Sequence, residues 1–185
     1  RLTATNALVD HDVPGAAGWG RFQIAEAANF TSSRETAWIE AVPANDFILK
    51  TKVDGLRPGR VHYYRLIFGP DKEHTGKGPV RRFKTLPAPD QPVPVRFVVG
   101  NCMNYSSFYD GHGGESGKAR QNPKDRLLGY PSMESIRRLR PDFFVGAGDN
   151  VYYDQPVRTA AKTLPELRRK WHEQFVLPLV AALVG

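Results

Sequence analysis

The sequence predicts an all-β sandwich followed by the first part of an α/β domain. Short β-rich runs separated by Gly, Pro, Asn and Asp clusters fill the first half and predict the sandwich. A strand, loop, helix, strand order in the second half predicts the α/β part. Between them, residues 86–94 hold four prolines in nine residues, which stiffen an extended connector. We therefore expect a sandwich domain, a linker and the start of an α/β domain over residues 1–86, 87–94 and 95–185.

The composition is that of a folded protein, because 41 % of the residues are hydrophobic and 24 % are charged. No stretch approaches the roughly 18 to 20 apolar residues of a membrane-spanning helix, so we expect no transmembrane segment. No export signal opens the chain. The formal net charge of +7 is spread through every segment, which favours a solvated surface over a nucleic-acid-binding face. A basic surface would also favour an anionic substrate.

Strand patterns in the first domain are clearest at residues 20–24, 46–50 and 62–66. Residues 56–60 have the layout of a turn that feeds a penultimate sandwich strand, with Leu56 as its buried plug. This turn and the strand after it resemble a fibronectin type III domain. Such a domain would have a tyrosine at position 62 to form the corner hydrogen bond, and His62 stands there instead. Any antiparallel sheet with a Pro-Gly turn is the alternative interpretation.

The second domain begins with an apolar strand over residues 95–100, and a second one follows at residues 142–148. Between them we expect a long loop over residues 103–124 and a helix over residues 132–139. The two strands would pair in parallel. A further helix begins at its capping residue Thr163, and its Arg and Lys residues are expected to form a solvated face.

Both of these strands end in residues that carry chemistry. Cys102 follows the first strand and Asp149 the second, so the two side chains are expected together at the carboxyl edge of the sheet. A thiolate and a carboxylate there suggest a metal. A carboxylate in this position can bridge two cations about 3.5 to 4 Å apart, which activate a water and clamp a phosphoryl oxygen. Tyr152 is near enough for its phenolate to reach the same ion, and phenolate with thiolate favours a polarising metal such as iron.

Cys102 is the only cysteine, which excludes an internal disulfide. A lone cysteine is most often core filler, with nucleophile and metal ligand as the alternatives. A phosphatase nucleophile of the Cys-x5-Arg kind is excluded because residue 108 is phenylalanine. The five histidines form no His-x-His pair, and we treat none of them as a strong ligand candidate.

Residues 101–104 together with residues 142–154 resemble the alkaline phosphatase D (PhoD-like) family of calcineurin-like metallophosphoesterases. Residues 167–175 resemble the helix that follows in this family, and residues 82–87 resemble the last strand of its sandwich. The most specific part is the Gly-Asp-x-x-Tyr block in combination with the lone strand-end cysteine. The resemblance is to the N-terminal portion, and it implies that the second domain is the first part of an α/β/β/α sandwich.

The resemblance implies hydrolysis of phosphate monoesters, diesters or both by a metal-bound hydroxide. It implies that Cys102, Asp149 and Tyr152 hold iron, that Asp149 is the catalytic bridging ligand and that calcium is the neighbouring ion. Asn104 and Asn150 are near enough in sequence to touch the phosphate, and loop hydrogen bonding is the alternative role for both residues.

By the same resemblance, the remaining ligands are expected beyond Gly185, in the rest of a longer polypeptide, and this piece alone would lack activity. Export to the periplasm or the cell exterior is also implied. The alternative function is a non-catalytic binding module with a degenerate phosphoesterase domain. Nucleic-acid binding through the basic surface is a third possibility, and it needs no metal.

Overall fold

The computed structural model describes residues 15–110, 123–155 and 160–184. Contacts between Cα atoms divide the described residues into one unit that ends at Pro94 and another that begins at Val95. Within the described residues, no helix combines the length and the apolar character that crossing a membrane requires.

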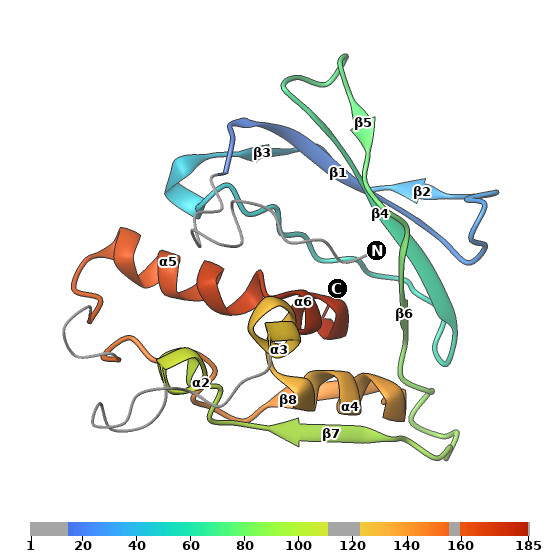
Figure 1. Ribbon diagram of the computed structural model, residues 1–185. Helices are drawn as coiled ribbons and strands as arrows, with labels where there is room; N and C mark the ends of the chain where they lie inside the picture. The colour runs from blue at the N-terminus through green and yellow to red at the C-terminus, as the bar shows by residue number, and fades with distance from the viewer. Residues whose placement is uncertain (1–14, 111–122, 156–159, 185) are drawn as a thin grey trace. The chain divides into compact units, whose positions relative to one another are not determined.

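The first unit is an antiparallel sheet built around two long strands, β1 (Gly18–Ala25) and β4 (Val61–Gly69) (Figure 1). These strands pair over nearly their whole length, from Trp19 opposite Gly69 to Ala25 opposite Tyr63. Short strands extend the sheet on both sides. Strands β2 (Arg34–Glu35) and β3 (Ile39–Ala41) pair with β1, and β5 (Gly76–Lys77) and β6 (Arg81–Lys84) pair with β4.

The strands predicted at residues 20–24 and 62–66 are confirmed by β1 and β4. The strand predicted at residues 46–50 is wrong. A 3-10 turn, η1 (Pro43–Asn45), precedes that segment, and the φ angles of Asp46 and Phe47 are 55° and 57°. These values lie in the left-handed region, so the backbone turns there instead of extending.

A second sheet facing the first is what makes a sandwich, and the described residues of this unit form a single sheet. One apolar residue of the segment 46–50, Leu49, packs on that sheet instead. Leu49 lies so close to β1 that a Cβ atom added to Gly20 would stand 2.4 Å from its Cδ1 atom. The two-sheet, fibronectin-like sandwich therefore stays a prediction.

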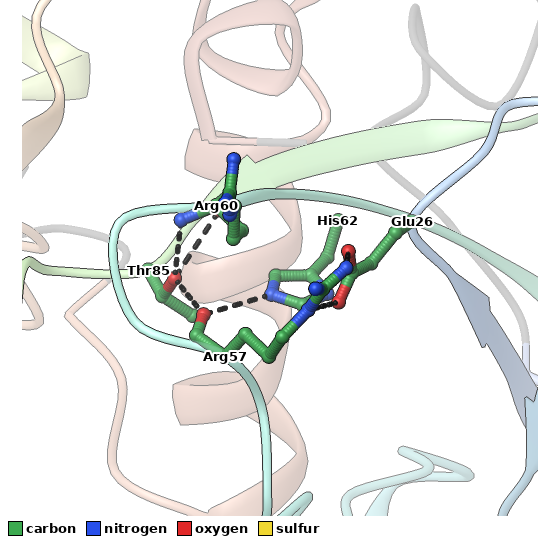
Figure 2. Close-up of polar contacts among 5 residues, drawn as sticks. All are labelled: Glu26, Arg57, Arg60, His62 and Thr85. Atoms are coloured by element: carbon green, nitrogen blue, oxygen red, sulfur yellow. Dashed lines mark hydrogen bonds and ion pairs between the residues drawn. The ribbon is translucent and has the colours of Figure 1, made fainter.

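The turn before β4 is held by the corner residue His62 (Figure 2). Its Nε2 atom lies 3.3 Å from the carbonyl oxygen of Arg57, to which it donates. The ring is 2 % exposed and stacks on Phe83, with centroids 5.4 Å apart. The Thr85 hydroxyl also donates to the Arg57 carbonyl, at 2.7 Å. The imidazole thus makes the kind of side-chain contact to upstream backbone that the tyrosine hydroxyl makes in a tyrosine corner.

Two further contacts fix this turn. Gly59 has a φ of 65°, which glycine adopts at no steric cost, and its N–H donates to the carbonyl of Leu86 at 2.8 Å. The Arg57 guanidinium forms a two-fold ion pair with Glu26, and this hydrogen bonding lowers the pKa of the glutamate (Figure 2). Leu56 is only half-buried, so its predicted role as a buried plug is wrong.

The second unit contains a pair of parallel strands, β7 (Phe97–Gly100) and β8 (Phe143–Gly146) (Figure 1). Phe97 is opposite Phe143 and Gly100 is opposite Gly146, so both strands end at the same edge. The predicted parallel pair is confirmed. Five helices belong to this unit among its described residues: α2 (Tyr105–Asp110), α3 (Pro123–Leu128), α4 (Pro131–Leu139), α5 (Leu164–Phe175) and α6 (Pro178–Val184).

Helix α4 confirms the helix predicted over residues 132–139, and α5 confirms the one that begins at Thr163. The Thr163 hydroxyl accepts from the N–H of Glu166 at 3.5 Å, and the Glu166 carboxylate accepts from the N–H of Thr163 at 2.8 Å. This is the reciprocal capping box. The long loop predicted over residues 103–124 is wrong where α2 and the start of α3 occur, and residues 111–122 lie outside the described part.

The core of the second unit is formed where α4 and α6 pack together. Its buried members include Met103, Met133, Leu177 and Val180. Met103 directly follows Cys102 and is 7 % exposed, so its burial anchors the end of β7. The position of Cys102 is therefore fixed from the protein interior.

Candidate metal centre

The carboxyl ends of the two parallel strands bring Cys102 and Asp149 together. Hydrogen bonding continues past the strands, since Ala147 donates its N–H to the Gly100 carbonyl at 2.8 Å and Met103 donates to the Asp149 carbonyl at 2.9 Å. The Cys102 Sγ atom lies 3.7 Å from Asp149 Oδ2. The strand order therefore produces the juxtaposition that the sequence led us to expect.

Tyr152 reaches the same carboxylate oxygen. Its hydroxyl donates to Asp149 Oδ2 at 3.0 Å. This hydrogen bond, followed by one with Cys102, raises the pKa of Tyr152 above its ordinary value, because both neighbours favour the protonated phenol. A sulfur atom and a phenolic oxygen thus converge on one carboxylate.

The backbone at this site is unusual. Cys102 and Asp149 have φ angles of 58° and 50°, in the left-handed region that non-glycine residues seldom adopt. Such residues cost on the order of 1–3 kcal/mol each, and they cluster at functional sites. Gly148 precedes the aspartate with a φ of 113°, which a residue with a Cβ atom rarely adopts. The glycine thereby lets the chain turn sharply at the end of β8.

The donor set fits one part of a metal site. Thiolate, carboxylate and phenolate are all ligands of transition metals, and they converge here from two segments that the sheet holds in register. Cys102 and Asp149 are exposed and Tyr152 is half-buried, so the site is open to solvent. Metal sites commonly have four or more ligands, and the described residues gather no group of three His, Cys, Asp or Glu side chains.

Asn104 has a structural task in this unit. Its Oδ1 atom accepts from the N–H of Ser107 at 2.9 Å and from the hydroxyl of Ser106 at 3.2 Å, and its carbonyl accepts from the N–H of Phe108 at 3.0 Å. It therefore caps α2. This contact pattern favours the interpretation of Asn104 as a loop hydrogen-bonder, and its predicted phosphate contact stays a prediction.

Asn150 folds back onto the end of β8. A Cβ atom added to Gly146 would stand 2.8 Å from its Oδ1 atom, so the glycine makes room for this side chain. The Oδ1 atom is buried and finds no hydrogen-bond partner within the described part of the chain. The predicted phosphate contact of Asn150 likewise stays a prediction.

Two residues of α5 hold the segment after Asp149, and neither was predicted. The Trp171 indole donates to the hydroxyl of Tyr153, and the Lys170 ammonium donates to the carbonyl of Gln155 at 2.8 Å. The expectation that the basic residues of this helix form a solvated face is wrong for Lys170, which is half-buried. No motif in the sequence marks these contacts, because they join residues 15 to 18 positions apart through an irregular segment.

No protein-family model matches the sequence. The chain is 30 % identical over 144 residues to alkaline phosphatase D of Bacillus subtilis (strain 168), an alignment that covers 77 % of this chain and 20 % of that protein. It also resembles a solved structure of PhoD with a TM-score of 0.69 and 21 % identity, over 97 % of this chain and 32 % of the other. The chain thus spans about a fifth of the curated relative and about a third of the solved chain.

Proposed function

This chain belongs to the alkaline phosphatase D (PhoD-like) family, and from that premise we propose that it carries part of a metal-dependent phosphoester hydrolase site. The single observation that supports this most is the convergence of Cys102 Sγ and Tyr152 Oη on Asp149 Oδ2. The proposed reaction is hydrolysis of phosphate monoesters, diesters or both. A net charge of +7 suits an anionic substrate of this kind.

In this proposal, Cys102, Asp149 and Tyr152 would hold iron, and Asp149 would also hold a neighbouring calcium ion. A bound ion would supply Lewis-acid polarisation of a phosphoryl oxygen and of the attacking water. The role of the surrounding protein is to orient these three side chains. Sheet pairing fixes Cys102 against Asp149, and the glycine turn at Gly148 directs the carboxylate toward both partners.

Further ligands would come from the rest of a longer polypeptide. The solved PhoD chain is roughly three times as long as the part that this chain matches, which leaves ample sequence for them. We also propose that the complete protein is exported, as the family assignment suggests.

The proposal is tested on the full-length protein that contains this chain. We expect the parent protein to bind metal and to hydrolyse an aryl phosphate, a bis-aryl phosphate diester or both. The Asp149→Ala variant should lose both the metal and the hydrolysis rate. The matched control is Asp90→Ala, an exposed aspartate in the Pro-rich segment. Full turnover by Asp149→Ala would refute the proposal, and a parent protein without metal or turnover would favour a non-catalytic binding module.

A further inference from the structure

We propose that Trp171 and Lys170 of α5 are positioning residues for Tyr152. This inference rests on the proposed function, because it assigns a task to residues outside the candidate metal ligands. Helix α5 holds the chain directly after Tyr152, at Tyr153 and Gln155. It would thereby fix where the phenol stands relative to Asp149.

The segment that carries Tyr152 has no regular secondary structure, so contacts to other elements must fix it. At its start, the Asp149 carbonyl accepts from the N–H of Met103 at 2.9 Å. After Tyr152, the carbonyl of Tyr153 accepts from the N–H of Ala161 at 2.7 Å. Tyr152 therefore stands between two anchored points, one on the core and one near the start of α5.

The two contacts from α5 strengthen the second anchor. An indole N–H can only donate, so the Tyr153 hydroxyl is the acceptor in its bond with Trp171. The Lys170 ammonium donates a charge-assisted hydrogen bond to the Gln155 carbonyl, and such bonds are stronger than neutral ones. Together they hold one aromatic side chain and one backbone carbonyl of the segment.

Helix α5 is a firm support for these contacts. Its start is closed by the capping box, and near its end Gln174 is 1 % exposed and accepts from the hydroxyl of Tyr130 at 3.0 Å. The Trp171 ring stacks on Phe175, with centroids 5.1 Å apart and an interplanar angle of 17°. The indole is thus held in place independently of its bond to Tyr153.

This support matters because ligand geometry tolerates little movement. A binding constellation must be held within about 0.5 Å of its productive geometry, and loss of an outer partner typically lowers metal affinity about 10- to 100-fold. Tyr152 has its hydroxyl 3.0 Å from Asp149 Oδ2. Release of Tyr153 or Gln155 would let the phenol move away from that oxygen.

The first test measures metal affinity of the full-length protein by competition with a chelator. Trp171→Phe keeps the stacked ring but removes the donor, and we expect about tenfold weaker binding. Tyr153→Phe should weaken binding equally, and the double variant should be no weaker than either, since both changes remove the same hydrogen bond. Lys170→Met should cause a second, independent loss of metal affinity. The matched control is Arg169→Gln on the same helix, whose ion pair with Glu173 does not involve the segment.

The second test needs no metal. In the metal-free protein, Trp171→Phe should speed hydrogen exchange at the amide of Ala161, which bonds to Tyr153, and leave the amides of α5 as in the parent. Unchanged hydrogen exchange at Ala161 would overturn the proposal that Trp171 holds the chain after Tyr152. Faster exchange at Ala161 with unchanged metal affinity would show that Trp171 holds this part of the chain without positioning Tyr152, and would also overturn the proposal.

The two proposals fail in different ways. If Asp149→Ala keeps its metal, the proposed function is wrong. If Asp149→Ala loses its metal while Trp171→Phe and Lys170→Met bind it as tightly as the parent, only the positioning inference is wrong.

Discussion

The Tyr152 hydroxyl lies 3.0 Å from Asp149 Oδ2, three residues earlier in the chain. A tyrosine at that spacing would ordinarily extend away from an aspartate at the end of a strand. Here Gly148 and Asp149 both have positive φ angles, so the chain turns back and the phenol meets the carboxylate. The Gly-Asp-x-x-Tyr block is therefore a local turn that joins two chemically different ligands.

Tyr152→Phe removes the phenolic oxygen and keeps the ring. Loss of a direct ligand should cost at least as much as loss of an outer partner, so we expect metal affinity of the full-length protein to fall by at least about tenfold. Equilibrium dialysis against the metal measures this. Tyr63→Phe, in the first unit, is the control, and an unchanged affinity of Tyr152→Phe would exclude this residue as a ligand.

Gly148→Ala tests the turn itself. A Cβ atom at Gly148 would meet nothing within 4 Å, and the same holds for Gly76, for which no positive φ is found. Alanine at Gly148 must adopt a φ near 113°, so we expect a loss of roughly 1–3 kcal/mol in the free energy of unfolding. Gly76→Ala should change it by less than about 0.5 kcal/mol. Because neither site is crowded, the difference between the two variants in urea unfolding reports the backbone strain at Gly148. Equal effects would contradict the strained turn.

His62 should support the first unit through both its hydrogen bond and its ring. His62→Phe keeps a ring beside Phe83 and loses the bond to the Arg57 carbonyl, which still accepts from Thr85, so the cost should be about 1 kcal/mol or less. His62→Ala also leaves a cavity, and we expect about 3 kcal/mol. Urea midpoints measure the difference. A His62→Ala protein as stable as the parent would show that the corner contributes nothing.

Glu134 should make the stability of α4 depend on pH. Hydrogen bonds from Arg137 and Arg138 lower its pKa from 4.5 to about 2. Because the pKa is lowered by folding, the stabilisation is fully present above pH 4.5 and is lost as the pH falls toward about 2. Glu134→Gln should therefore unfold at a lower temperature than the parent at pH 7, with the gap closing below pH 4.5. A gap that stays constant down to pH 2 would contradict this.

Local sequence patterns predicted correctly the strands and helices whose hydrophobic pattern agrees with the way that they pair or pack. Strands β1, β4, β7 and β8 and helix α5 have strong periodicity or capping signals, and each formed where expected. Residues 46–50 have the β-rich composition of a strand, but the apolar side chain of Leu49 covers Gly20 instead of extending the sheet. Sequence pattern alone does not distinguish covering a sheet from joining it.

The candidate site shows the same division. Cys102 and Asp149 could be brought together from the sequence because parallel strands end at one edge. The contacts of Trp171 and Lys170 could not, since they depend on how a helix packs against an irregular segment. Helix α2 was missed because Asn104 looked like a loop residue, although asparagine is also a preferred helix cap.

The most direct test is anomalous X-ray diffraction at the iron absorption edge, from crystals of the full-length protein that contains this chain. We expect an anomalous peak within bonding distance, roughly 2.0–2.5 Å, of Cys102 Sγ, Tyr152 Oη and a carboxylate oxygen of Asp149. The peak should be absent from crystals of Asp149→Ala. A metal peak elsewhere in the protein, with none beside these three side chains, would contradict a metal centre at the ends of β7 and β8.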